Sequence, residues 1–227
     1  MLERAAESGP HDLIVMPEAV AMLCYPDDRP DFTYYDVAED VPGPTTDEAS
    51  RTAKTHHVNV VIGLIDRRED GCQNLAVVID RSGKIVGAYE KLHEPEICIR
   101  EQAALEATGP APVFDLDFGR IGIFICWDNL YPELSDELKS SGADMLVLPH
   151  LMSFANDRGQ AKLVREHARR NRIPLVMAGM RDAHNHNDGQ DGLWPTAVLD
   201  ADGSVIAQTD KAGSDLVSCA VLLRSGR

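Results

Sequence analysis

The chain has 227 residues, 44% of them hydrophobic, which is enough to bury the core of one sizeable domain and too few for two large ones. Its formal net charge of -15 at pH 7 argues against nucleic acid and anionic membranes as partners. No run approaches the roughly 18 apolar residues that span a bilayer, and the first ten residues do not resemble a signal peptide. We therefore expect one cytoplasmic domain over residues 1–227.

Short runs rich in β-branched residues, separated by turn signals, predict buried strands. Two tetrapeptides between paired runs, "DRSG" at 80–83 and "DADG" at 200–203, have the glycine that hairpin turns favour. The expected strands lie at 12–17, 58–65, 74–80, 84–90, 120–126, 144–149 and 174–180.

Between other strands the hydrophobic period becomes helical, and helices are predicted over 44–57, 131–142 and 156–172. Their start signals are Thr46, Pro132 and Asp157, and Gly142 is a stop signal. Strands that alternate with helices and hairpins indicate an α/β fold in which helices cover a sheet.

The cysteines and histidines predict neither a disulfide framework nor a metal site. The five cysteines are odd in number and lack CxxC spacing, so at least one thiol is free. Residues 181–192 contain two histidines at i and i+2, but no second pair of ligands lies at a sequence spacing typical of a metal site. The cysteines are Cys24, Cys72, Cys98, Cys126 and Cys219.

Three predicted strands end on side chains capable of chemistry, namely Glu18, Lys91 and Cys126. Taken singly, each has a plain structural interpretation: a solvated glutamate, a surface lysine and an inert buried thiol. Together they supply a base, an ammonium for an oxyanion and a nucleophile without requiring histidine. Strand alternation also predicts that Lys91 faces away from its neighbour Glu90.

The motifs "LIVMPEA", "GAYEKLH" and "GRIGIFICWDNLYPELSDELKSSGADMLVLP", in this order, resemble the signature blocks of the nitrilase superfamily of carbon-nitrogen hydrolases. The resemblance extends from about residue 10 to about residue 223. It implies an αββα sandwich that forms a homodimer or larger homo-oligomer. Family members begin with a strand before the first helix, whereas here Met1 falls within that helix, so we expect the first strand to be missing.

The resemblance also implies roles for individual residues. Glu18 is the expected general base, Cys126 the nucleophile and Lys91 the oxyanion-stabilising cation, with the backbone N–H of Trp127 as a second donor. A supporting glutamate follows the lysine, and we favour Glu96 over Glu94 and Glu101. The expected pocket-lining residues after the 144–149 strand are His150, Met152 and Phe154.

The resulting prediction is a thiol hydrolase that cleaves the non-peptide C–N bond of a small amide or N-carbamoyl compound without a cofactor. A nitrile is the alternative substrate, because the same thiol attack would give a thioimidate. A non-catalytic scaffold or binding protein on the same fold is the alternative of another class. A histidine-assisted cysteine protease has no local sequence signature to support it.

Overall fold

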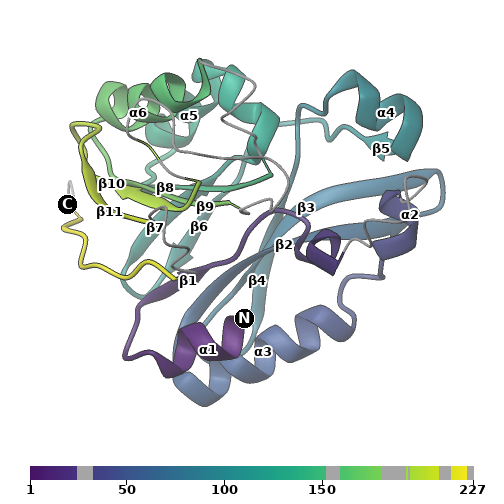
Figure 1. Cartoon of the computed structure of the whole chain (residues 1–227), viewed down its shortest axis with the longest axis horizontal. Coiled ribbons are helices and arrows are strands. Elements are labelled where there is room, and N and C mark those ends of the chain that lie inside the picture. Colours follow the sequence, from purple (N-terminus) through teal and green to yellow (C-terminus); the bar gives the residue numbers. More distant parts are fainter. Residues whose placement is uncertain (25–32, 152–158, 180–192, 194, 210–215, 224–227) are drawn as a thin grey trace. The chain divides into compact units, whose positions relative to one another are not determined.

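The computed structural model describes residues 1–24, 33–151, 159–179, 193, 195–209 and 216–223. The chain divides into two compact units, Met1–Pro110 and Ala111–Arg227, each built around its own sheet (Figure 1). The described residues form two sheets and six α-helices, so the predicted α/β class is confirmed. The expectation of a single domain over 1–227 stays a prediction.

The sheet of the first unit places the ends of two strands at the same edge. Its order is β1-β2-β3-β4, with β5 pairing β3. The β1–β2 pair is parallel, whereas β2–β3 and β3–β4 are antiparallel, so β1 and β4 run in the same direction. The residues that follow these two strands therefore emerge at one end of the sheet. The strands are Leu13–Val15 (β1), Asn59–Arg68 (β2), Gly71–Ile79 (β3), Ile85–Glu90 (β4) and Ala104–Leu105 (β5).

One face of this sheet carries the apolar core of the unit. Helices α1 and α3 lie side by side against it (Figure 1). Alternate residues of β2, among them Val60 and Ile62, pack with Ala49 and Ala53 of α3. Because successive strand residues point to opposite faces, Gly63 and its neighbours at the same parity face the other side. The helical segments are Leu2–Glu7 (α1), Val20–Cys24 (η1), Tyr34–Val37 (α2), Pro44–His56 (α3) and Glu96–Gln102 (α4).

The sheet of the second unit has the order β11-β10-β9-β8-β7-β6. Its three central strands β7, β8 and β9 are parallel, and the outer pairs are antiparallel. Helices α5 and α6 contact each other in this unit (Figure 1). The elements are Val113–Leu116 (β6), Gly119–Ile123 (β7), Cys126–Leu130 (η2), Pro132–Ser140 (α5), Met145–His150 (β8), Gln160–Asn171 (α6), Leu175–Gly179 (β9), Ala197–Leu199 (β10) and Val205–Gln208 (β11).

The two predicted hairpin turns are confirmed. Gly83 and Gly203 both have positive φ, of 82° and 81°, which is the conformation that glycine adopts at low cost. The predicted helix starts at 44 and at Pro132 are confirmed, although Thr46, the start signal named for the first of these helices, lies at its third position. Helix α3 begins at Pro44, and Gly43 is its N-cap. The hydroxyl of Thr46, the third residue of the helix, accepts a hydrogen bond from the Gly43 N–H at 2.8 Å. Asp157, the predicted start of α6, lies outside the described residues.

The predicted strand over 120–126 is too long at its carboxyl end. Strand β7 ends at Ile123, and Phe124 adds one further bond to the Val147 carbonyl at 3.2 Å. The Ile125 N–H instead donates to the Asp128 carboxylate at 2.8 Å, which turns the chain out of the ladder. Cys126 is therefore the first residue of the 3-10 turn η2 rather than the last residue of a strand.

In the described ranges, β1 is an edge strand with helix α1 before it. The apolar side chains of α1, including Leu2 and Ala5, belong to the core of the first unit. None of the helices in these ranges is both long and apolar enough to cross a membrane.

Candidate active site

The side chain of Lys91 lies between two buried carboxylates. Its Nζ atom is 2.9 Å from Glu18 Oε1 and 3.0 Å from Glu94 Oε2. The exposed fraction of each of these three residues is 5% or less. A buried ammonium is stable only when it is paired, and two carboxylates at hydrogen-bond distance supply that pairing. The interpretation of Lys91 as a surface lysine is therefore wrong.

The backbone of Glu18 reaches this cluster by lying directly on strand β2. Gly63 donates its N–H to the Pro17 carbonyl at 3.2 Å. A Cβ atom at Gly63 would come within 2.6 Å of Glu18 Cα, so any other residue would push the glutamate off the sheet. Ala19 then has a φ of 43°, which marks a sharp turn immediately after the glutamate.

Strand alternation turns Lys91 inward, as predicted. Its neighbour Glu90 accepts a hydrogen bond from Arg68 at 2.8 Å, and both of these side chains are about 40% exposed. The Lys91 N–H donates to the Asn74 carbonyl at 2.9 Å, which anchors the lysine backbone to β3. The lysine thus lies at the same end of the sheet as Glu18.

Two titratable side chains near this charged cluster, Tyr34 and Cys98, have raised pKa values. Burial raises the pKa of the Tyr34 phenol well above its usual range, and the nearby charge of Glu18 raises it further. The Tyr34 hydroxyl donates to Cys98 Sγ at 4.0 Å. Burial also raises the pKa of the Cys98 thiol, with a further contribution from Glu94. Both groups therefore stay protonated at neutral pH.

In the second unit, Cys126 lies in a sharply turned backbone. Its φ is 47°, which is rare for a residue with a Cβ atom and is common at functional sites. Asp128 closes the turn, because its N–H donates to the Ile125 carbonyl at 2.9 Å while its carboxylate accepts the Ile125 N–H at 2.8 Å. The thiol of Cys126 is half-buried, and Trp127 is 36% exposed.

A buried polar network joins this turn to helices α5 and α6. The Asn129 carbonyl accepts a hydrogen bond from His167 Nε2 at 3.0 Å, and the Asn129 amide donates to Gln160 Oε1 at 2.5 Å. Burial lowers the pKa of His167, so the ring is neutral and its proton lies on Nε2. The other nitrogen then accepts from the Ser135 hydroxyl at 2.8 Å. Turn η2 is thereby fixed to α5 and α6.

Comparison with known proteins decides the family. A family model described as carbon-nitrogen hydrolase matches residues 1–225, which is nearly the whole chain. The chain belongs to the carbon-nitrogen hydrolase family. The predicted resemblance is therefore confirmed, and the protein is a member of a family of hydrolases.

Individual relatives of this carbon-nitrogen hydrolase include a citrullinase from Francisella tularensis, 27% identical over 231 residues that span 94% of this chain and 78% of that protein. Among solved structures, a carbon-nitrogen hydrolase from Helicobacter pylori superposes with a TM-score of 0.74 at 23% identity, covering 92% of this chain and 77% of that one. An amidase from Nesterenkonia sp. gives 0.71 at 17% identity, covering 92% and 76%. At these identities the superpositions show a shared nitrilase-type fold.

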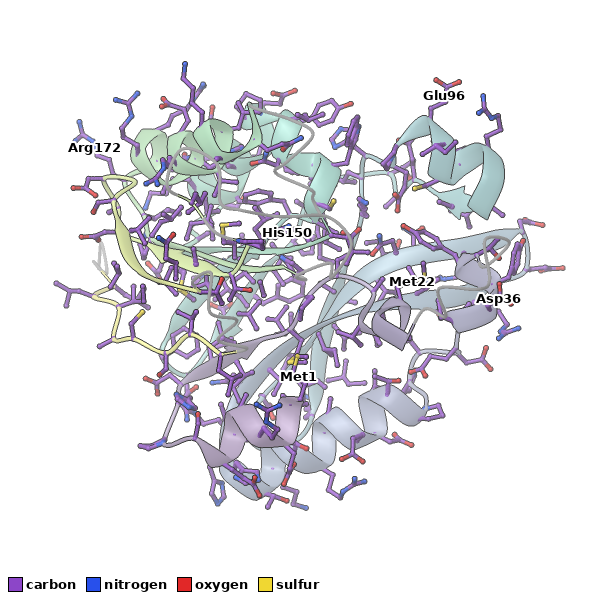
Figure 2. The ribbon with its side chains drawn as sticks, in the orientation of Figure 1. Met1, Met22, Asp36, Glu96, His150 and Arg172 are labelled. Atoms are coloured by element: carbon purple, nitrogen blue, oxygen red, sulfur yellow. The ribbon has the colours of Figure 1, made fainter. Side chains whose placement is uncertain are left out.

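Of the candidate supporting glutamates, Glu94 contacts Lys91 and the favoured Glu96 does not. Glu94 contacts Lys91, whereas Glu96 is exposed on the first turn of α4 and points outward (Figure 2). Pro95 caps this helix, so the chain changes direction between the two glutamates. The side chain of Glu101, the third candidate, lies outside the described residues.

The expected pocket residues of the hydrolase are only partly described. His150 ends strand β8, is fully buried and donates from Nε2 to the Pro195 carbonyl at 2.6 Å (Figure 2). A Cβ atom at Gly179 would lie 2.3 Å from the imidazole, so glycine on the paired strand makes room for the ring. Met152 and Phe154 lie outside the described residues.

Metal ligation finds no support in the described ranges. They contain no group of three or more His, Cys, Asp or Glu side chains that could hold a metal ion. The histidine-containing segment 181–192 lies outside them.

Proposed function

We propose that this hydrolase cleaves a non-peptide C–N bond in a small amide or N-carbamoyl compound, with Glu18 as general base, Lys91 as oxyanion-stabilising cation and Cys126 as nucleophile. The observation that carries the proposal is the burial of Lys91 between Glu18 and Glu94. An ammonium fixed in this way costs little reorganisation when an oxyanion forms beside it.

The negative charge of Glu94 offsets part of the preference that Glu18 has for its ionised form beside Lys91, and so assists proton transfer to Glu18. One ammonium and two carboxylates carry a net charge of -1, and like charges near each other disfavour the fully ionised state. When Glu18 accepts a proton, Lys91 and Glu94 remain as a neutral ion pair. Glu94 therefore keeps the lysine charged while Glu18 gains and loses its proton.

In the proposed acylation, Glu18 takes the thiol proton of Cys126 and the thiolate attacks the carbonyl carbon. The oxyanion of the tetrahedral intermediate is stabilised by Lys91 and by the backbone N–H of Trp127. The C–N bond then breaks, and the amine or ammonia leaves with the proton from Glu18. A thioester on Cys126 remains.

Deacylation uses the same base a second time. Water gives a proton to Glu18 and attacks the thioester carbon. Collapse of this intermediate breaks the C–S bond, and Glu18 returns the proton to the sulfur of Cys126. The products are a carboxylic acid from an amide, or a carbamic acid from an N-carbamoyl group, and the enzyme is regenerated without a redox or metal cofactor.

Ammonia and amine release from a panel of small amides, N-carbamoyl amino acids including citrulline, and small nitriles tests this proposal. The relatives named citrullinase and amidase favour the amide and carbamoyl members. The proposal is supported if ammonia or amine is released from the amide or carbamoyl substrates by the parent but not by Cys126→Ala. Turnover of nitriles alone supports the nitrile alternative. No turnover by a chain with native circular dichroism supports the non-catalytic scaffold.

A homodimer or larger homo-oligomer and a cytoplasmic location complete the proposal. Both come from the sequence and its family resemblance. Light scattering of the purified chain tests the first, and fractionation of cells that produce it tests the second. A monomer at micromolar concentration would contradict the oligomer.

A further inference from the structure

Asn74 contacts both residues that form the central ion pair of the first unit. It lies in strand β3 and is fully buried. Its side-chain amide donates to Glu18 Oε1 at 2.7 Å, and its backbone carbonyl accepts the Lys91 N–H at 2.9 Å. Asn74 is thus hydrogen-bonded both to the glutamate that follows β1 and to the lysine that follows β4.

Two donors converge on the same carboxylate oxygen. Lys91 Nζ lies 2.9 Å from Glu18 Oε1, and the Asn74 amide approaches the same atom. Hydrogen bonds to an ionised acceptor are roughly twice as strong as those between neutral groups. Together the two donors fix the orientation of the carboxylate and favour its ionised form.

The side-chain oxygen of Asn74 indicates that an amide is not at this position merely to stabilise the fold. Its Oδ1 atom is buried and has no hydrogen-bond partner among the described residues. Its partner across the ladder is the apolar Ile65 of β2. An unsatisfied buried acceptor costs free energy, so an apolar residue of similar size would suit the sheet better. The contact that requires an amide is the one to Glu18.

We infer that Asn74 is a positioning residue, which orients the Glu18 carboxylate beside Lys91 for proton transfer. The inference rests on the proposed function, because it assigns Glu18 the role of base. Other charged or titratable groups at this cluster in the described residues include Lys91 and Glu94 from the segment after β4, Tyr34 from α2 and Cys98 from α4.

Carbon-13 NMR of the whole chain, labelled at the side-chain carboxyl of glutamate, tests the inference without requiring turnover. The Glu18 resonance is identified by its disappearance in Glu18→Gln. Its chemical shift is then followed from pH 3 to pH 9 in the parent, Asn74→Ala and Asn74→Asp. Asn59→Ala is the matched control, since Asn59 is a buried strand asparagine whose amide donates to the Asp12 carbonyl at 2.8 Å.

Loss of a hydrogen bond to the charged form should move protonation of Glu18 to higher pH by about one unit in Asn74→Ala. Asn74→Asp should move it further, because the new carboxylate repels Glu18 and the two titrate as a coupled pair. Asn59→Ala should leave the curve in place. Curves in either folded Asn74 variant that superimpose on the parent curve would overturn the inference.

The kinetic readout separates this inference from the proposed function. If the parent turns over an amide, Asn74→Ala should lower kcat by about tenfold or more with KM changed less, because positioning acts on the reacting state. An inactive parent with displaced Glu18 curves would refute the proposed reaction and leave the contact of Asn74 with Glu18 established. An active parent with unchanged curves would refute the role of Asn74 alone.

Discussion

Glu94 Oε2 lies 3.0 Å from Lys91 Nζ, and neither side chain is more than 1% exposed. Two residues further along the chain, Glu96 is exposed on α4 (Figure 2). The same short segment therefore offers one glutamate that contacts the lysine and one that does not, which makes a matched pair for mutagenesis.

Glu94→Gln should lower kcat by about a hundredfold, since the isosteric amide removes the charge that keeps Lys91 paired when Glu18 is protonated. Glu96→Gln should leave kcat within about twofold of the parent, as expected for an exposed surface residue. Steady-state kinetics on an amide found by the substrate panel checks both values. Equal losses in the two variants would contradict the assignment of Glu94.

Lys91→Met should destabilise the first unit, because it leaves Glu18 and Glu94 as two buried carboxylates without their ammonium. Breaking a buried ion pair by removing one partner costs about 3–5 kcal/mol of the free energy of unfolding. The loss should be larger at pH 8 than at pH 5, since protonation of a carboxyl relieves the unpaired charge. Urea unfolding at the two pH values measures it.

The control for this variant is Arg68→Met, which removes a partly exposed ion pair with Glu90 on the same sheet. Exposed pairs contribute only about 0–1 kcal/mol. A second variant, Lys91→Met with Glu94→Gln, should recover part of the lost stability. A loss for Lys91→Met no greater than that for Arg68→Met would show that the buried cluster does not depend on its lysine.

Gly63→Ala should impair turnover more than stability. Its methyl group would lie 2.6 Å from Glu18 Cα and 2.5 Å from the Pro17 carbonyl, so the segment that carries Glu18 must move. Overpacking of this kind costs roughly 1–3 kcal/mol, and a displacement of about 1 Å at a reacting group can cost a hundredfold in rate.

Val60→Ala is the control for Gly63→Ala, because Val60 points from the same strand into the α1–α3 core. It should lower the melting temperature without changing kcat at 25 °C. If both variants retain parental kcat, the close approach of Glu18 to β2 has no functional consequence.

Much of this site could be predicted from the sequence, because its residues follow strands whose pattern is strongly periodic. The inward direction of Lys91 follows from the alternation of β4, and the two glycine hairpins follow from their turn residues. Asn74 was predicted only as the first residue of an apolar strand. The polar pair "QN" at 73–74, within a buried strand, is the signal that could have identified it.

Other features depend on geometry that spacing does not specify. The choice between Glu94 and Glu96 depends on where the chain turns at Pro95 to begin α4. The end of β7 depends on the Asp128 carboxylate, which captures the Ile125 N–H before the ladder can reach Cys126. The end of β7 is thus a hydrogen-bond competition that one side chain decides.

His167 should make the protein less stable in acid. Burial lowers its pKa in the folded state below the unfolded value of about 6.5, so the unfolded chain binds a proton more readily. The free energy of unfolding should therefore fall by up to about 1.4 kcal/mol for each pH unit below 6.5, until the pH reaches the folded pKa. The contribution is fully present above pH 6.5.

His167→Gln should flatten this pH dependence, because glutamine can donate to the Asn129 carbonyl without gaining a charge. Urea unfolding of parent and variant at pH 7.5, 6.5 and 5.5 gives the difference between the two slopes. His11→Gln, a change near the surface, is the control. Parallel slopes for parent and His167→Gln would exclude a neutral buried His167.

The most direct test of the thiol mechanism is intact-mass analysis of the enzyme, quenched in acid while it turns over an amide. We expect a mass increase equal to the acyl group, mapped by peptide digestion to Cys126 and absent from Cys126→Ala, which should also be inactive. An acyl group on another residue, or turnover that persists in Cys126→Ala, would show that Cys126 is not the nucleophile.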